Sequence, residues 1–134
     1  MIGVLLVTHG QIGASLLDSA AQILDSAPRL TATLGVSRTD DPDDLVLRAR
    51  QLLEELDGGD GVLVLTDIFG ATPGNVVSRL LDDNHVEGVS GVSLPMLLRV
   101  LTSRNGSLSA AVKRALSGGS EGVVHMNSDR CLDA

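Results

Sequence analysis

The segment Ile2-Gly3-Val4-Leu5-Leu6-Val7-Thr8-His9-Gly10 begins with aliphatic side chains and ends in a polar turn. An unbroken aliphatic run that stops at a turn is typical of a strand buried on both faces, as in the centre of a parallel sheet. In open α/β sheets, ligands and reacting groups gather at the carboxyl ends of the strands. We therefore expect His9 to stand at the edge of the sheet where a functional site forms.

A second segment, Val62-Leu63-Val64-Leu65-Thr66-Asp67, ends in the same way. It predicts another buried strand, followed by a carboxylate instead of an imidazole. Because the carboxyl ends of parallel strands lie at the same edge of a sheet, we expect His9 and Asp67 to meet there.

The rest of the chain alternates between helical and strand patterns. Apolar residues recur at helical spacing over residues 12–26 and alternate over residues 30–36, as in an edge strand. The acidic cluster at residues 39–44 surrounds a proline, a pattern that favours a helix start over a metal site. Further helices are predicted from Thr72 through Leu81, from Pro95 through Leu101 and from Ser107 to a stop at Gly118-Gly119, and further strands over residues 86–92 and 122–126. This alternation predicts one doubly wound α/β domain over residues 1–134, with a mostly parallel sheet.

Composition argues against several classes of function. The 134-residue chain has a formal net charge of −7, and Phe69 is its only aromatic residue. The acidic balance argues against binding to nucleic acid or to an anionic membrane surface, and it suits a basic protein partner. A platform that stacks bases cannot be built from one aromatic side chain. No signal peptide is visible and no apolar run approaches the ~20 residues of a membrane helix, so we expect a cytoplasmic protein in which Cys131 stays unpaired.

His9 and Asp67 together suit the transfer of a phosphoryl group. A carboxylate that accepts a hydrogen bond from one ring N–H fixes the tautomer and leaves the other nitrogen free to attack. The same carboxylate stabilises the positive charge that the ring gains when it takes the phosphoryl group. The alternative is a purely structural role, in which His9 is a core histidine with a satisfied hydrogen bond. It predicts that His9→Ala mainly lowers the stability of the fold.

The turns beside these two residues suit a phosphate. Gly10 lets the backbone approach a ligand closely, and the helix after it directs free N–H groups at the same point. The turn at residues 70–72 starts another helix and offers backbone amides and one hydroxyl. No Walker-type loop, nearby cysteine or second histidine at ligand spacing accompanies them, so we expect no metal and no cofactor. The residues predicted to bind the phosphoryl group are Gly10, Ile68, Gly70, Ala71 and Thr72.

Three segments carry a resemblance to a known family. They are residues 7–10 (VTHG), residues 66–79 (TDIFGATPGNVVSR) and residues 91–97 (GVSLPML). In order and spacing they resemble the signature segments of the mannose-family IIA domain (EIIA-Man) of the bacterial phosphoenolpyruvate-dependent sugar phosphotransferase system. The resemblance implies a mostly parallel sheet of strand order 2-1-3-4, with a short C-terminal antiparallel strand exchanged between the subunits of a homodimer. Residues 122–126 are the candidate for that strand.

The resemblance also implies a phosphotransferase that works through a covalent phosphohistidine. His9 accepts the phosphoryl group on Nε2 from the phosphocarrier protein HPr and passes it to a IIB domain for sugar uptake and phosphorylation, with Asp67 as its hydrogen-bonded partner. The IIB domain is expected in trans, because the chain ends soon after its last predicted strand. Contact with the membrane is expected only indirectly, through permease components. The residues expected to dock these partners are Phe69, Pro73, Gly74, Pro95 and Met96.

Two positions depart from the family pattern. Thr72 stands where serine is common, which keeps the hydroxyl. Gly74 stands where an aromatic residue is common, which removes a contact surface and affects partner choice.

Three alternatives stay open. A IIA-like regulatory phosphoprotein without a cognate permease, and a subunit that donates phosphoryl groups to a dihydroxyacetone kinase, use the same histidine chemistry. A small tetrapyrrole chelatase, whose first strand also ends in a histidine-glycine turn, predicts metal or porphyrin binding and gives Asp67 no role.

Overall fold

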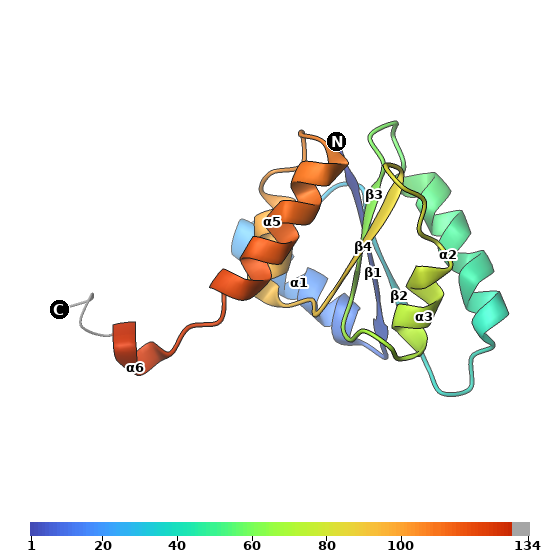
Figure 1. Cartoon of the computed structure of the whole chain (residues 1–134), viewed down its shortest axis with the longest axis horizontal. Helices are drawn as coiled ribbons and strands as arrows, with labels where there is room; N and C mark the ends of the chain where they lie inside the picture. The colour runs from blue at the N-terminus through green and yellow to red at the C-terminus, as the bar shows by residue number, and fades with distance from the viewer. Residues whose placement is uncertain (130–134) are drawn as a thin grey trace.

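Within residues 1–129, which the computed structural model describes, four parallel strands form one sheet in the order β2-β1-β3-β4. Figure 1 shows this sheet between its helices. The strands are β1 (Gly3–His9), β2 (Thr31–Val36), β3 (Val62–Thr66) and β4 (Val86–Ser90). The helices are α1 (Ile12–Leu24), α2 (Pro42–Leu56), α3 (Thr72–Ser78), α4 (Leu94–Leu101), α5 (Leu108–Glu121) and α6 (Met126–Asp129). The predicted α/β fold and strand order are confirmed.

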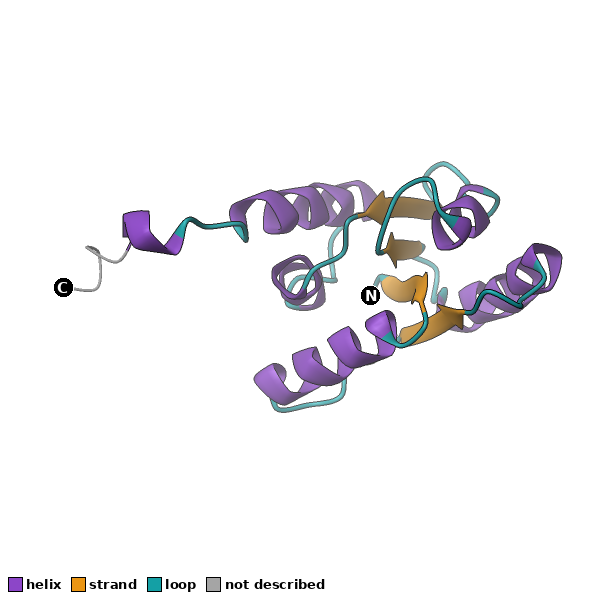
Figure 2. Cartoon of the chain, turned by 90° about the horizontal axis from the view of Figure 1, so that it is seen from below, coloured by secondary structure: helices purple, strands orange, loops and turns teal. Residues whose placement is uncertain are grey.

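Helices cover both faces of the sheet, as Figure 2 shows in a view turned by 90°. α1, α4 and α5 pack on one face around Leu6, Leu65 and Leu97, and α2 and α3 pack on the other around Val7 and Val64. All residues of β3, and all of β1 except its last, are buried. Burial on both faces explains the unbroken aliphatic runs in the sequence. The two central strands are therefore held from both sides up to their carboxyl ends.

Helix starts follow the predicted capping chemistry. The Asp41 side chain accepts a hydrogen bond from the Asp43 backbone N–H at 3.0 Å, so the acidic cluster starts α2 as expected. Ser93 and Ser107 cap α4 and α5 in the same way. α3 is shorter than predicted and ends at Ser78. None of the helices in the described part of the chain has the length and apolar character needed to cross a lipid bilayer.

The predicted helix stop at Gly118-Gly119 is wrong, because α5 continues to Glu121. Packing explains the two glycines. A Cβ atom added to Gly118 would lie 3.2 Å from Met96 Cα, and one added to Gly119 would lie 2.9 Å from Met96 Cε. The absence of a side chain at Gly118 lets α5 approach the backbone of α4 closely, so this glycine serves helix packing and not chain reversal. Met96 Cε is the end of a flexible side chain, so the contact at Gly119 is less restrictive.

The predicted strand over residues 122–126 does not form in the chain by itself. Residues 122–125 are a loop, and Met126 starts α6. This segment leads away from the sheet (Figure 1), so no described strand is at hand to pair with it. Cys131 lies outside the described residues.

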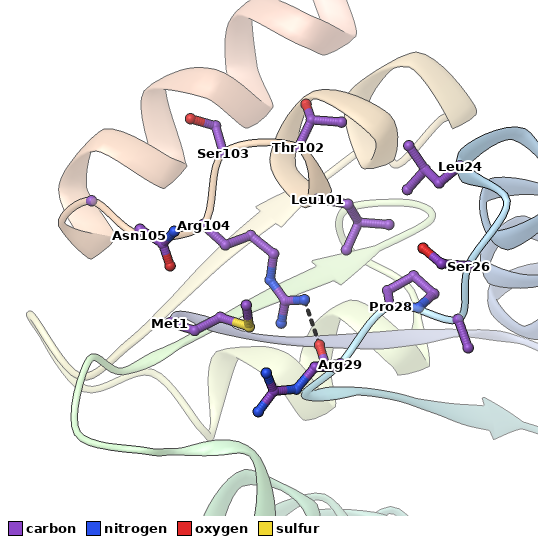
Figure 3. Close-up of a pocket in the computed structure, with 12 residues that line it drawn as sticks. Met1, Leu24, Ser26, Pro28, Arg29, Leu101, Thr102, Ser103, Arg104 and Asn105 are labelled. Carbon is purple, nitrogen blue, oxygen red and sulfur yellow. Dashed lines mark hydrogen bonds between the residues drawn. The ribbon is translucent and has the colours of Figure 1, made fainter.

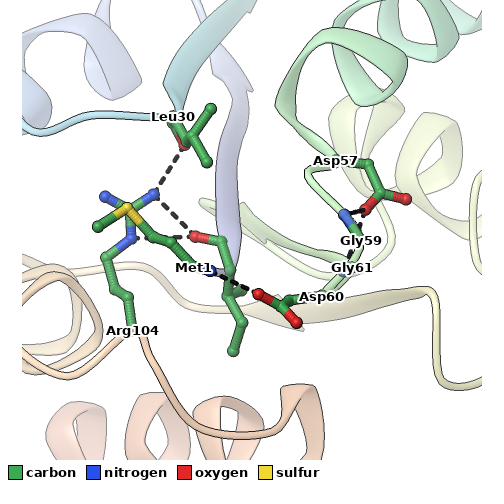
Figure 4. Close-up of polar contacts among 8 residues, drawn as sticks. Met1, Leu30, Asp57, Gly59, Asp60, Gly61 and Arg104 are labelled. Atoms are coloured by element: carbon green, nitrogen blue, oxygen red, sulfur yellow. Dashed lines mark hydrogen bonds and ion pairs between the residues drawn. The ribbon is translucent and has the colours of Figure 1, made fainter.

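Arg104 ties the amino-terminal edge of the sheet to two loops. Its guanidinium donates to the carbonyl oxygen of Ile2 from Nε (3.0 Å) and Nη2 (2.8 Å), and to that of Leu30 from Nη2 (2.9 Å). Nη1 donates to the carbonyl oxygen of Arg29 (Figure 3), and Figure 4 shows the bond to Leu30. With 6% of its surface exposed, Arg104 is a buried charge that satisfies three carbonyl groups, a role that the sequence analysis missed.

We expect Arg104→Met to lower the free energy of unfolding by about 2–5 kcal/mol, because the carbonyl groups of Ile2 and Arg29 lose the guanidinium as donor and that of Leu30 keeps only the Val4 N–H. Urea denaturation followed by circular dichroism measures the change. Arg48→Met, at an exposed position on α2, is the control and is expected to stay within about 0.5 kcal/mol of the wild type. A loss for Arg104→Met no larger than that of the control contradicts the assigned role.

Candidate functional site

The fold brings His9 and Asp67 to the same edge of the sheet. His9 is the last residue of β1, and Asp67 directly follows β3. The two strands are parallel neighbours with Val7 opposite Thr66. The segments that follow them therefore leave the sheet side by side. The predicted meeting of the imidazole and the carboxylate is confirmed.

The Asp67 carboxylate holds His9 by two hydrogen bonds to one oxygen. Oδ2 accepts the His9 backbone N–H at 3.1 Å and lies 2.8 Å from Nδ1 of the ring. Oδ1 accepts the Ile68 backbone N–H at 3.1 Å, which fixes the orientation of the carboxylate itself. In a neutral imidazole, this arrangement places the proton on Nδ1 and the lone pair on Nε2. Nε2 is therefore the ring nitrogen that Asp67 leaves free.

The His9 ring and the Asp67 carboxylate differ in exposure and in charge. The His9 side chain is 50% exposed, whereas that of Asp67 is 13% exposed. Burial raises the pKa of the Asp67 carboxyl, but the hydrogen bonds from the ring and backbone of His9, and the charge of His9, outweigh it and hold the pKa below its usual range. A carboxyl with a lowered pKa favours the folded state at neutral pH, and this contribution is lost as the pH falls through the folded-state pKa. Asp67 is thus an ionised partner for an accessible imidazole.

The turn after His9 is fixed by backbone and side-chain bonds. Gly10 has a φ of +47°, in the left-handed region, and its N–H donates to the Val36 carbonyl at 2.9 Å. Thr8 is buried, and its Oγ1 accepts the Gly13 backbone N–H at 2.8 Å. The first turn of α1 is therefore tied to the end of β1, which holds the amino terminus of α1 next to His9. The sequence analysis missed this use of Thr8, although a polar residue at the end of an aliphatic run beside His9 is a visible signal.

The other predicted phosphoryl-binding residues lie on the loop that leads from Asp67 into α3. Ile68, Gly70 and Thr72 are exposed, and Ala71 is half-buried. Gly70 has a φ of +89°, which a residue with a side chain adopts at a cost. Ala71 is the residue before α3 and has no side-chain oxygen to cap it, so the first N–H groups of that helix lack a side-chain acceptor at this position. Thr72 is the first residue of the helix, as the sequence predicts.

Only part of the predicted docking set lies on the surface. Phe69 is 82% exposed, and Pro95 is exposed too. Pro73, Gly74 and Met96 are buried, so the prediction that a partner touches them directly does not fit the structure. A Cβ atom at Gly74 would lie 2.9 Å from the Ile68 carbonyl oxygen. This glycine therefore lets the loop after Asp67 pack against α3.

A shallow apolar hollow that was not predicted lies beside the His9 turn. It has a volume of about 500 Å³ and is lined by Ile12, Leu16 and Leu94, among others. No group of three or more His, Cys, Asp or Glu side chains that could hold a metal ion occurs within residues 1–129.

Comparison with known proteins agrees with the geometry. The family model EIIA-man, described as "PTS system fructose IIA component", matches residues 3–116. The mannose-specific EIIAB component of the Escherichia coli K12 phosphotransferase system is 31% identical over 125 residues, which cover 91% of this chain and 38% of that protein. The fructose-specific EIIA component of Bacillus subtilis 168 is 31% identical over 105 residues, which cover 78% of this chain and 71% of that protein.

A solved structure extends the likeness to the whole described fold. The phosphotransferase system component EIIA from Streptococcus agalactiae superposes with a TM-score of 0.85 at 25% identity, covering 96% of this chain and 99% of that one. The match to the family model includes both His9 and Asp67. The chain therefore belongs to the mannose/fructose family of phosphotransferase-system IIA components.

Proposed function

We propose that the protein carries a phosphoryl group on His9 Nε2, received from the phosphocarrier HPr and passed to a IIB domain for sugar uptake and phosphorylation. The observation that carries this proposal is the 2.8 Å contact between Asp67 Oδ2 and His9 Nδ1. It leaves Nε2 as the free nitrogen on a side chain that is half exposed. A cytoplasmic location follows from the proposal.

Each of the two transfers, from HPr to His9 and from His9 to the IIB domain, is a nucleophilic displacement at phosphorus. The Nε2 lone pair of His9 forms an N–P bond while the bond between phosphorus and the donor nitrogen of HPr breaks, and the donor imidazole keeps that electron pair. The phosphorylated ring of His9 retains its Nδ1 proton and carries positive charge, which Asp67 neutralises at hydrogen-bond distance. In the second step a nucleophile of the IIB domain takes the phosphoryl group, and the electron pair returns to Nε2.

Backbone groups near His9 are suited to hold the phosphoryl oxygens during both steps. They belong to the amino-terminal turn of α1 after Gly10 and to the loop through Gly70, Ala71 and Thr72 that starts α3. N–H groups at a helix start attract negative charge and need no metal ion to do so. We assign the phosphoryl-binding role to these residues and to Ile68.

The docking surface of the partners lies around the same edge of the sheet. Ile68 (54% exposed), Phe69 and Ile12 (46% exposed) place apolar side chains on the surface beside His9, and Pro95 adds to them at the start of α4. The net charge of −7 favours a basic partner through long-range attraction. These features support docking of HPr and of a IIB domain, one after the other, on this surface.

We also propose that two copies of the chain form a homodimer through the segment after α5. Val123 (84% exposed), Val124 (50%) and Met126 (79%) carry apolar surface away from the core. Within residues 1–129, β4 is an outer strand of the sheet. Val86 at its start forms a bridge with Asp82, and the rest of this edge can accept a further strand. Exchange of the segment over residues 122–126 between copies buries these side chains and pairs that edge.

Replacing His9 by alanine is expected to abolish phosphoryl uptake without unfolding the protein, because Nε2 is the proposed acceptor and the side chain is half exposed. The protein is incubated with phosphoenolpyruvate, enzyme I and HPr, and the added phosphate is read by intact mass. His85→Ala, which removes an exposed histidine, is the control and is expected to take one acid-labile phosphate like the wild type. Uptake by the His9 variant, or none by a folded wild type, contradicts the proposal.

Replacing Asp67 by alanine is expected to slow phosphoryl uptake by about a hundredfold or more while the fold is retained, because the ring loses the partner that fixes its tautomer and neutralises its charge. The rate is measured by quenched-flow mass analysis. Asp82→Ala, which removes an exposed carboxylate of the turn before β4, is the control. A wild-type rate in the Asp67 variant removes Asp67 from the mechanism.

The double substitution Val123→Asp and Val124→Asp is expected to turn a dimer into a monomer of 13.9 kDa, because two carboxylates oppose burial of the segment. Sedimentation equilibrium measures the mass. Ile23→Asp with Leu47→Asp adds the same charge at exposed apolar positions of α1 and α2, and this control is expected to remain a dimer. A monomeric wild type, or a dimeric Val123/Val124 variant, contradicts the proposed exchange.

A further inference from the structure

A second hollow lies at the opposite edge of the sheet from His9. It has a volume of about 550 Å³ and lies between the loop after α1 and the loop that joins α4 to α5. Figure 3 shows Arg104 reaching from the second loop to the backbone of Arg29 on the first. Arg104 binds the carbonyl of Ile2, before β1, whereas His9 ends that strand, so about 20 Å separate the two places.

The charge of this hollow is unlike that of the rest of the molecule. The chain has 17 acidic and 10 basic residues. The described residues that line the hollow include two arginines, Arg29 and Arg104, and no aspartate or glutamate. Two positive charges therefore share one cavity in a protein of net charge −7.

The Arg104 charge is buried without a carboxylate within ion-pair distance in the described part of the chain. Four of its five N–H groups are used, all by carbonyl oxygens, and one on Nη1 remains. Carbonyl dipoles stabilise a guanidinium, but they carry no net charge. Burial and, after it, repulsion by Arg29 lower the pKa of Arg104. A negative charge in the hollow acts on this pKa in the opposite direction, because it favours the charged form of Arg104.

Further donors surround the same space. The Arg29 guanidinium is on the surface and makes no hydrogen bond or ion pair within residues 1–129. Ser103 and Asn105, which carry a hydroxyl and a side-chain amide, also line the hollow. A guanidinium presents parallel N–H groups that match two oxygens of a phosphate group.

We propose that this hollow binds a small molecule that carries a phosphate group. Arg29 makes the direct contact, and Arg104, Ser103 and Asn105 complete the donor set. Two guanidinium charges match the dianion of a phosphate monoester better than a single carboxylate, and the volume accommodates a small metabolite. The site is separate from His9 and does not depend on the proposed phosphoryl relay.

The test is a titration of the full chain with sodium phosphate, followed by two-dimensional amide NMR, beside sodium chloride at matched ionic strength. We expect saturable shifts confined to residues 26–30 and 102–106, with phosphate and not with chloride. Arg29→Gln is expected to weaken the binding at least fivefold. Arg104 is left intact, because it also holds the fold together.

Arg48→Gln is the matched control, since it removes the same charge from an exposed position on α2. It is expected to leave the phosphate affinity unchanged. The proposal is overturned if phosphate and chloride have equal effects, or if the two substitutions have equal effects. It is also overturned if the shifts are confined to the residues around His9. Phosphoryl uptake on His9 is measured in parallel, and the Arg29 variant is expected to take up phosphate like the wild type, which separates this site from the relay.

Discussion

The parallel pairing of β1 with β3 is the constraint on which the candidate site depends. Both strands are aliphatic and buried, so their register is fixed by the packing of helices on two faces. The register places Val7 opposite Thr66, and the next residues outward include the imidazole and the carboxylate. A shift of one residue would turn these side chains to the opposite face. The core thus sets the geometry of two groups that are not themselves part of it.

Asp67 connects the paired strands β1 and β3 to the imidazole of His9. The same carboxylate oxygen accepts a backbone N–H of β1 and contacts the ring of the same residue. The backbone bond holds the end of the strand, and the ring contact sets the tautomer. Because the second oxygen is bound to the backbone of Ile68, the carboxylate is oriented before any partner arrives. Such preorganisation lowers the cost of bringing a reacting group into alignment, as the proposed phosphoryl transfer requires.

Much of the fold and the central pair of the site could be predicted because the signals are local. The aliphatic runs that end at His9 and Asp67, and the capping residues Asp41 and Ser107, each act through neighbouring residues. Contacts between distant segments could not be predicted in this way. Gly118 is indistinguishable in sequence from a helix stop until α4 is placed against it.

The same limit applies to the surface of the site and to the far edge of the sheet. Met96 was expected on a docking surface, but its side chain faces the core, since the rotation of α4 decides which residues point outward. Arg104 has no acceptor near it in sequence, because its acceptors are the residue before β1 and two residues of the loop before β2. A pattern along the chain carries no information on either point.

Arg104 also bears on the order in which the chain becomes structured. Its acceptor Ile2 precedes it by 102 positions, so the beginning of the first strand is secured by a residue near the end of the domain. During synthesis, β1 and β2 are complete long before Arg104 has been made, so their amino-terminal edge at first has only its own backbone bonds, such as that from the Val4 N–H to the Leu30 carbonyl. Closing a loop of this length costs conformational entropy that local contacts do not repay. The bonds that join the amino-terminal edge of the sheet to the loop between α4 and α5 can therefore form only after that loop has been made.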